Sequence, residues 1–120
     1  MRIRDVARAA GFALLVTFLV GCTQAGASAP SPVATSTVDL PPSYRFVPAD
    51  ISIPAGTTVT WTNSDHFTHS VKFLDGGLPS EPLVMDPGQA VTFTLAAPGL
   101  YHYQCHLHPQ NMVGSITVEP

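Results

Sequence analysis

The residues with the most distinctive chemistry lie close together near the C-terminal end of the chain. Cys105 is followed within seven positions by His106, His108 and Met112. A thiolate, an imidazole and a thioether suit copper in both of its oxidation states, and a Cys-His-His set with a long axial Met is the blue-copper arrangement. The segment therefore predicts a mononuclear copper site.

The Cys-His-His set requires a histidine from another part of the chain, because the short C-terminal loop supplies only one. His69 is the best candidate for that ligand. It stands where a strand is expected to begin, within the segment 61–73, as a ligand from the facing sheet should.

Other copper centres are excluded by counting residues. A binuclear electron-transfer centre needs two cysteines in its loop, and this loop has only Cys105. The His-Cys-His signature of multicopper oxidases is absent because Gln104 precedes the cysteine, and 5 histidines cannot supply a trinuclear cluster plus a mononuclear site. Two alternatives stay open, zinc in a Cys-His-His site and a nucleophilic Cys-His hydrolase. The methionine favours copper, and no general base, orienting group and oxyanion donor are evident for a hydrolase.

The other histidines are expected to be solvated side chains. Alternation along a strand puts His102 on the face opposite Cys105, His106 directly follows that cysteine, and His66 lies in a loop before a strand. Met85 is expected to pack in the core rather than to bind metal.

The elements that position these residues are predicted to be strands. Short runs of β-branched and aromatic residues fill the chain from Tyr44 onward, and apolar and polar residues alternate most clearly at 58–62, 91–95 and 116–119. Turn residues separate such runs at 54–56, 75–77, 86–88 and 97–99. The pattern predicts an all-β Greek-key sandwich of about seven strands over residues 44–120.

The N-terminal part is predicted to direct export and anchoring. Residues 1–21 have a basic start and a 13-residue apolar stretch, typical of a secretory signal and shorter than the roughly 20 residues of a membrane-spanning helix. Leu19-Val20-Gly21-Cys22 resembles the lipobox of bacterial lipoproteins, so Cys22 is predicted to be lipidated and to start the mature chain. Two or more acyl chains would anchor it stably to a membrane. Residues 22–43, rich in Ala, Ser, Thr and Pro, are predicted to be a flexible linker.

Charge excludes nucleic acid as a partner. After the predicted signal peptide, Arg45 and Lys72 are the only strong bases against seven acids, a net charge of −5. Phosphate binding draws on clustered Lys and Arg, which this chain lacks. If Cys22 carries lipid, Cys105 is an unpaired thiol in an oxidising compartment, for which metal ligation is the leading explanation.

The chain from about residue 44 to 119 resembles the cupredoxins of the plastocyanin, amicyanin and pseudoazurin type. The matching features are Phe46-Val47-Pro48-Ala49-Asp50-Ile51, Ile53 to Trp61, Asn63 six residues before His69-Ser70-Val71, Pro98-Gly99-Leu100-Tyr101 before Cys105, His108 three residues later, and Met112-Val113-Gly114. The resemblance implies one copper per chain, with His69, Cys105 and His108 as equatorial ligands and Met112 as the weak axial ligand.

Three features depart from the family pattern. His106-Leu107 stands where a small residue and Pro are usual, and three residues separate His108 from Met112, where amicyanin-like loops have two and plastocyanin-like loops four. Ser70 stands where plastocyanins carry Asn, so the bond from this position to the cysteine loop is expected to be made differently.

The resemblance implies a membrane-tethered, extracytoplasmic carrier of single electrons between redox partner proteins, and not an enzyme. The partner is expected to dock weakly near His108, Leu107 and Pro109, and a monomer is the default for a small carrier. The alternative is a lipoprotein that binds or delivers copper. A metal-free adhesion-like sandwich would leave the thiol, His108 and Met112 unexplained.

Overall fold

The structure is a computed structural model that describes residues 21, 26 and 28–120. The predicted lipidation site Cys22, and all of the predicted signal peptide except Gly21, lie outside the described residues. Within the described part, no helix has the length and apolar character needed to cross a membrane.

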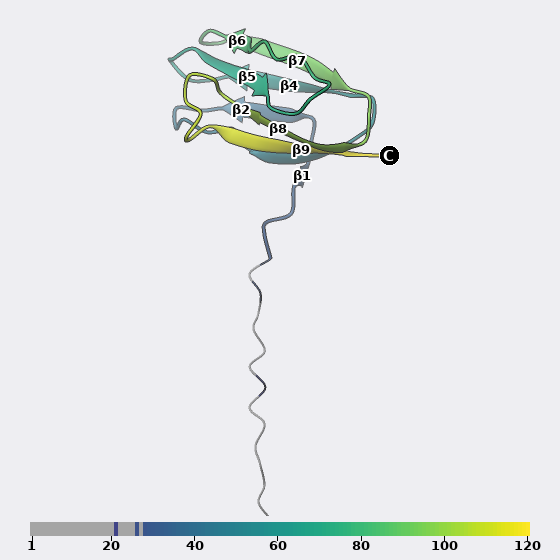
Figure 1. Cartoon of the computed structure of the whole chain (residues 1–120). Helices are drawn as coiled ribbons and strands as arrows, with labels where there is room; N and C mark the ends of the chain where they lie inside the picture. The colour runs from purple at the N-terminus through teal and green to yellow at the C-terminus, as the bar shows by residue number, and fades with distance from the viewer. Residues whose placement is uncertain (1–20, 22–25, 27) are drawn as a thin grey trace, which may run out of the picture.

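The described residues form nine strands in two sheets that face each other (Figure 1). The larger sheet has six strands in the order β1-β3-β9-β8-β5-β6, and the smaller has three in the order β2-β4-β7. The all-β sandwich is confirmed, with nine strands where about seven were expected. The strands are β1 (Val33–Ala34), β2 (Thr37–Leu40), β3 (Asp50–Pro54), β4 (Thr57–Asn63), β5 (His69–Phe73), β6 (Leu83–Met85), β7 (Ala90–Leu95), β8 (Gly99–Gln104) and β9 (Val113–Glu119).

Two of these strands correct the predicted domain boundary. β1 and β2 lie within residues 22–43, which were predicted to be a flexible linker. β2 runs parallel to β4 and buries Val38 and Leu40 in the core. The folded domain therefore begins before residue 44. Val38 and Leu40 alternate with polar residues, so this short strand can pair with β4 and bury one face in the core.

The alternating runs identified in the sequence do form strands. β4 pairs antiparallel with β7 and fully buries Val59 and Trp61. β9 buries Ile116 and Val118 beneath the larger sheet. Side chains of successive strand residues point to opposite faces, so one face of each strand closes the core.

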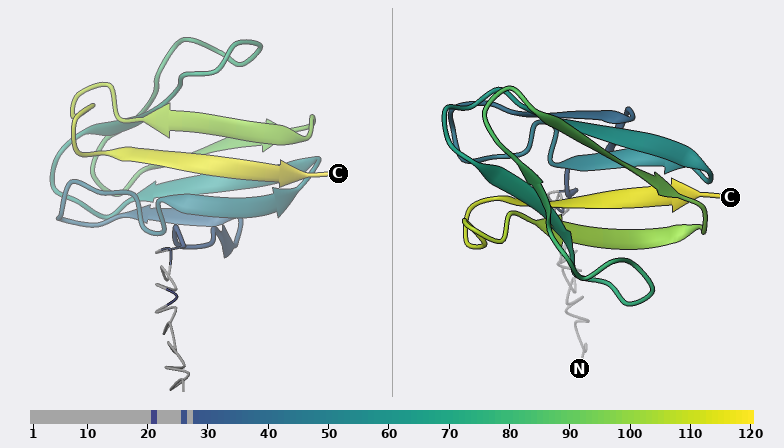
Figure 2. Two further views of the ribbon diagram at one scale, coloured as in Figure 1. Left: turned by 60° about the horizontal axis from the view of Figure 1, so that its bottom comes forward. Right: turned by 90° about the horizontal axis from the view of Figure 1, so that it is seen from above.

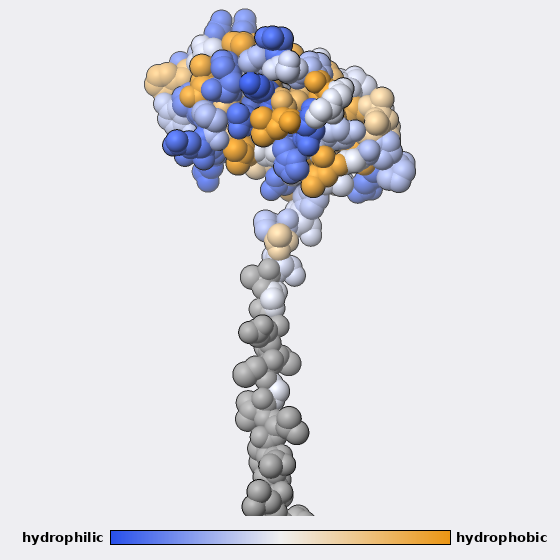
Figure 3. Space-filling model, in the orientation of Figure 1, coloured by the Kyte–Doolittle hydropathy of each residue, from blue (hydrophilic) through white to orange (hydrophobic). Residues whose placement is uncertain are grey.

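The predicted ligand segments meet at one end of the sandwich. β8 and β9 are antiparallel neighbours, and residues 105–112 turn between them at the end opposite the C-terminus (Figure 2). β5 is antiparallel to β8, so its first residue, His69, lies at the same end as the residue that follows β8, Cys105. On the face shown in Figure 3, hydrophobic residues are interspersed with hydrophilic ones.

Candidate metal centre

Three of the predicted ligands converge in the folded chain. One ligand atom from each of His69, Cys105 and His108 lies within 4.8 Å of the other two. The thiol Sγ of Cys105 is 3.9 Å from Nδ1 of His69 and 3.7 Å from Nδ1 of His108. No other group of three such side chains occurs in the described part of the chain. The sequence prediction of these three residues as one site is therefore matched by their positions.

The cluster is shielded from water on most sides. His69 and Cys105 are fully buried, and His108 is half-buried. A fully buried thiol is unavailable to a substrate, which argues against the Cys-His hydrolase. The arrangement is suited to holding an ion, because one cysteine sulfur and two imidazole nitrogens lie within 4.8 Å of one another.

The loop that carries Cys105 and His108 is held together by hydrogen bonds within its own backbone. The Cys105 N–H donates to the carbonyl of Met112 at 3.0 Å, and the Met112 N–H donates to the carbonyl of His108 at 3.0 Å. The His108 N–H donates in turn to the carbonyl of Cys105 at 3.2 Å. These bonds fix the separation of Cys105 and His108 before any metal binds. Met112 is fully buried at the end of the loop, and its role as axial ligand stays a prediction.

A buried carboxylate lies on the far side of His69. Asp65 is 3% exposed, and its Oδ2 is 2.8 Å from Nε2 of His69. This hydrogen bond holds the pKa of Asp65 below its ordinary value against the opposing effect of burial, and a further bond from the His66 N–H lowers the pKa as well. In the sequence, Asp65 is distinguished only as one of the seven acids that follow the predicted signal peptide. Its position four residues before His69 was the available signal.

The amide of Asn63 holds the loop that contains Asp65. Its Nδ2 donates to the carbonyls of Phe67 at 2.8 Å and Met85 at 3.0 Å, and its Oδ1 accepts from the Asp65 N–H at 3.0 Å. Asn63 is fully buried. The residue that carried part of the sequence resemblance thus determines the path of the chain into His69.

Ser70 links β5 to the cysteine loop. Its Oγ accepts from the His106 N–H at 3.0 Å and lies 2.6 Å from Nδ1 of the same histidine. The hydroxyl also lies 3.8 Å from Sγ of Cys105. His106 is exposed, as expected, but it is bonded to Ser70 rather than simply solvated. The link expected at this position exists and uses a hydroxyl.

Two aromatic side chains beside the cluster were not identified from the sequence. The ring of Tyr44 makes edge contacts with those of His108 and His69, at centroid distances of 4.8 and 5.9 Å, and it stacks on Phe67 at 6.0 Å. Tyr44 is 37% exposed and Phe67 57% exposed. Tyr44 had been identified only as the start of the predicted domain, and neither residue has a spacing relative to the predicted ligands that would single it out.

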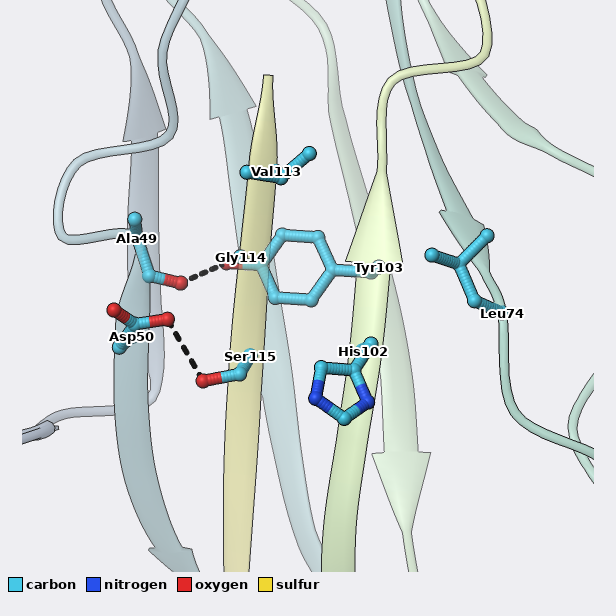
Figure 4. A pocket seen from close by; sticks show the side chains of 8 residues that line it. All are labelled: Ala49, Asp50, Leu74, His102, Tyr103, Val113, Gly114 and Ser115. Atoms are coloured by element: carbon cyan, nitrogen blue, oxygen red, sulfur yellow. Dashed lines mark hydrogen bonds between the residues drawn. The ribbon is translucent and has the colours of Figure 1, made fainter. Parts of the chain in front are cut away.

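The remaining candidates lie outside the cluster. His66 and His102 are exposed, and Nδ1 of His102 is 3.4 Å from a carboxylate oxygen of Asp75. Met85 is fully buried among core side chains, as expected. A pocket on the outer side of β3, β8 and β9 is lined by His102 but by none of the clustered ligands (Figure 4).

Comparison with known sequences identifies what the chain is similar to. Residues 35–119 match the model of a family described as copper binding proteins of the plastocyanin/azurin family. Plastocyanin of Sambucus nigra is 32% identical over 88 residues, which cover 63% of this chain and 89% of the relative. Chloroplastic plastocyanin of Hordeum vulgare is 35% identical over 83 residues, covering 61% of this chain and 54% of the relative. The chain spans about half the length of the chloroplastic relatives it matches.

Solved structures show the same likeness. A purple cupredoxin from Nitrosopumilus maritimus superposes with a TM-score of 0.64 at 29% identity, covering 71% of this chain and 100% of that chain. An amicyanin variant in its reduced state gives 0.63 at 31% identity, covering 74% and 92%. A copper-containing nitrite reductase from Thermus scotoductus gives 0.60 at 34% identity, covering 79% of this chain but 24% of that chain. The last match covers only one part of a larger chain.

Proposed function

Since this chain belongs to the plastocyanin/azurin family of copper-binding proteins, we propose that it carries single electrons between extracytoplasmic redox proteins. One copper ion would be held by His69, Cys105 and His108, with Met112 as the axial ligand. When bound, copper supplies a one-electron couple between Cu(II) and Cu(I). The chain itself acts as a carrier and converts no substrate.

The observation that carries the proposal is the buried convergence of one thiol and two imidazole nitrogens within 4.8 Å. The hydrogen bonds of the 105–112 loop hold Cys105 and His108 in place, and β5 holds His69 from the neighbouring strand. A site held by the fold rather than by the metal changes little between oxidation states, which favours fast electron exchange. Burial of Cys105 also protects the thiol from oxidation.

Docking is proposed around the half-buried edge of His108. Leu107 is 47% exposed and Pro109 is also exposed beside it. Tyr44 and Phe67 extend this apolar rim toward His69. A small apolar area of this kind suits the brief, low-area contacts of redox encounters.

Copper delivery is the less favoured function. Transfer to another protein requires ligands that the acceptor can reach, whereas His69, Cys105 and Met112 are each fully buried. Only His108 is partly accessible. The burial of the ligands therefore favours retention of the ion over its release.

We further propose that the domain is tethered to a bacterial membrane through lipid on Cys22. The first strand, β1, begins at Val33, so residues 23–32 are available as a spacer between the lipid and the fold. The full chain expressed in a bacterium should enter the membrane fraction, and the Cys22→Ser variant should not. Equal membrane partition of both would contradict the lipid anchor but not the copper site.

The proposed function is tested by spectroscopy on the chain from residue 23 onward. After one equivalent of Cu(II), we expect an intense visible thiolate-to-copper band and a narrow parallel hyperfine splitting in electron paramagnetic resonance. Ascorbate should bleach the band, and an oxidant should restore it. Cys105→Ser should remove the band, while Ser43→Ala, on the N-terminal side of the site, should keep it.

A pale spectrum typical of nitrogen and oxygen ligands would show that the thiol is not bound and would overturn the carrier assignment. An intense band together with rapid copper loss to an apo-acceptor would instead favour copper delivery. The spectrum and the rate of copper loss, measured on one copper-loaded sample, therefore distinguish electron transfer from copper delivery.

A further inference from the structure

A buried acid lies next to His69, and the family assignment gives this acid no role. Asp65 is 3% exposed, His69 is fully buried, and their side chains are 2.8 Å apart. Building on the proposed copper site, we propose that Asp65 is a positioning residue that fixes His69 as a ligand and lowers the reduction potential of the bound copper.

The hydrogen bond determines which nitrogen of His69 is free. A carboxylate can only accept, so the ring must donate its Nε2–H to Asp65. The other nitrogen, Nδ1, then carries a lone pair, and it is the atom that lies 3.9 Å from Sγ of Cys105. Asp65 therefore selects the tautomer that directs a free electron pair toward the cluster.

Asp65 is itself held on several sides. Its Oδ1 accepts from the His66 N–H at 2.6 Å, and its own N–H donates to Oδ1 of Asn63 at 3.0 Å. Both carboxylate oxygens are thus engaged, one by backbone and one by His69. The acid cannot turn away from the ring without breaking bonds in the loop that Asn63 anchors.

The negative charge of Asp65 is not offset by a cationic side chain. In the described part of the chain, its only ion-pair partner is His69, and no lysine or arginine pairs with it. His66 is exposed, so water screens that side chain. The charge of a buried carboxylate is screened much less, and it acts on the metal through a single imidazole ring.

The two histidine ligands are consequently unequal. His69 is fixed from both sides, by Asp65 and by the cluster, whereas His108 contacts Cys105 and the ring of Tyr44. Carboxylate partners of this kind raise the basicity of a metal-bound histidine. Cu(II) carries one more positive charge than Cu(I), so the acid stabilises the oxidised ion more and lowers the potential.

The experiment compares Asp65→Asn with Glu119→Gln in the copper-loaded full chain purified in detergent. Asparagine keeps the shape and an acceptor oxygen but removes the charge. Glu119 is the matched control, because it lies at the far end of β9 and its Oε1 accepts from Ser52 at 2.7 Å, a bond that glutamine can retain. Potentials are measured by redox titration, and Cu(I) and Cu(II) affinities by competition with chelators.

We expect Asp65→Asn to keep the visible band, to raise the potential, and to lower the affinity for Cu(II) relative to Cu(I) by about tenfold or more. Glu119→Gln should leave both quantities at wild-type values. An Asp65→Asn protein with the potential and affinity ratio of the control would overturn the proposal, even if its stability fell. A wild-type protein without the band would overturn the copper site and this proposal together.

If the Asp65→Asn variant fails to fold, a measurement on the unaltered chain still tests the proposal. In the Cu(I) form, nuclear magnetic resonance should detect a slowly exchanging Nε2–H proton on His69, because that proton is buried against Asp65. A His69 without a proton on Nε2, or with one that exchanges as fast as that of an exposed histidine, would overturn the positioning role.

Discussion

At the scale of single residues, Gly114 shows how the strand after the ligand loop is held in place. The ring of Tyr103 lies across Gly114, and its hydroxyl donates to the carbonyl of Ala49 at 2.8 Å (Figure 4). A Cβ on Gly114 would be 2.3 Å from that carbonyl oxygen and 2.5 Å from the Tyr103 ring. Burial raises the pKa of Tyr103, so its hydroxyl keeps the proton it donates. Glycine is required here by close approach rather than by backbone angle.

The first prediction concerns Gly114→Ala. The added methyl group must displace backbone or a buried ring, so we expect a loss of about 1–3 kcal/mol in the free energy of unfolding. Urea unfolding of the apo protein measures this loss. Gly76→Ala is the control, because nothing lies within 4 Å of its added Cβ and its backbone is ordinary. Equal stability of the two variants would contradict the packing role of Gly114.

The residue scale also shows what the sequence could and could not predict about the site. The clustering of His69, Cys105 and His108 could be predicted, because ligand chemistry restricts the residue types and the short loop restricts the spacing. Asp65 and Tyr44 could not be predicted, because their contacts with His69 and His108 depend on how the chain folds around the cluster. Many sequences allow an Asp four residues before a His, and only the fold shows that this one is buried against it.

At the scale of elements, β2 is a strand in a segment that was predicted to be a flexible linker. The strand is short and surrounded by Ser, Thr and Pro, a composition typical of linkers. β2 joins the sheet through residues that are distant in sequence, because Val38 pairs with Trp61 of β4 and Leu40 pairs with Asn63. Strands with long alternating runs, such as β4, β7 and β9, were predicted correctly because their pattern is local.

The second prediction is that a chain truncated at the predicted domain boundary is less stable than the full chain. A chain beginning at Tyr44 lacks β2 and the burial of Val38 and Leu40, which should cost about 3 kcal/mol or more in the free energy of unfolding. A chain beginning at Ser31 keeps both short strands and should match the full chain. Thermal unfolding of the two apo proteins measures the difference. Identical midpoints would mean that β2 contributes nothing to stability.

At the scale of the whole molecule, the acidic residues are separated from the loop that carries Cys105 and His108. The chain after Cys22 has a net charge of −5, yet the loop 105–112 contains no acid. Asp65, the acid that touches the cluster, is buried. In the proposed encounter, long-range attraction would come from the net charge of the whole surface, and contact would be made by the uncharged rim around His108.

The third prediction follows from this separation and concerns electron exchange with a small basic redox protein. Electrostatic steering raises association rates by about tenfold or more at low ionic strength, and salt shortens its range to about 10 Å at 0.1 M. The second-order rate of exchange, measured by stopped flow, should therefore fall steeply as salt is added. An acidic partner should show the opposite trend, and a rate independent of salt for both would contradict steering.

Leu107→Asp separates steering from contact in the same assay. The substitution adds one negative charge, which would strengthen attraction to a basic partner if steering alone set the rate. It also places a charge that must lose its water within the rim beside His108, where desolvation opposes docking. We expect the visible band to persist and the exchange rate to fall at every salt concentration. High salt screens long-range attraction, so the exchange rate that remains there depends on the surface in contact. A variant that kept its spectrum and exchanged as fast as the wild type at high salt would therefore show that the partner docks away from Leu107.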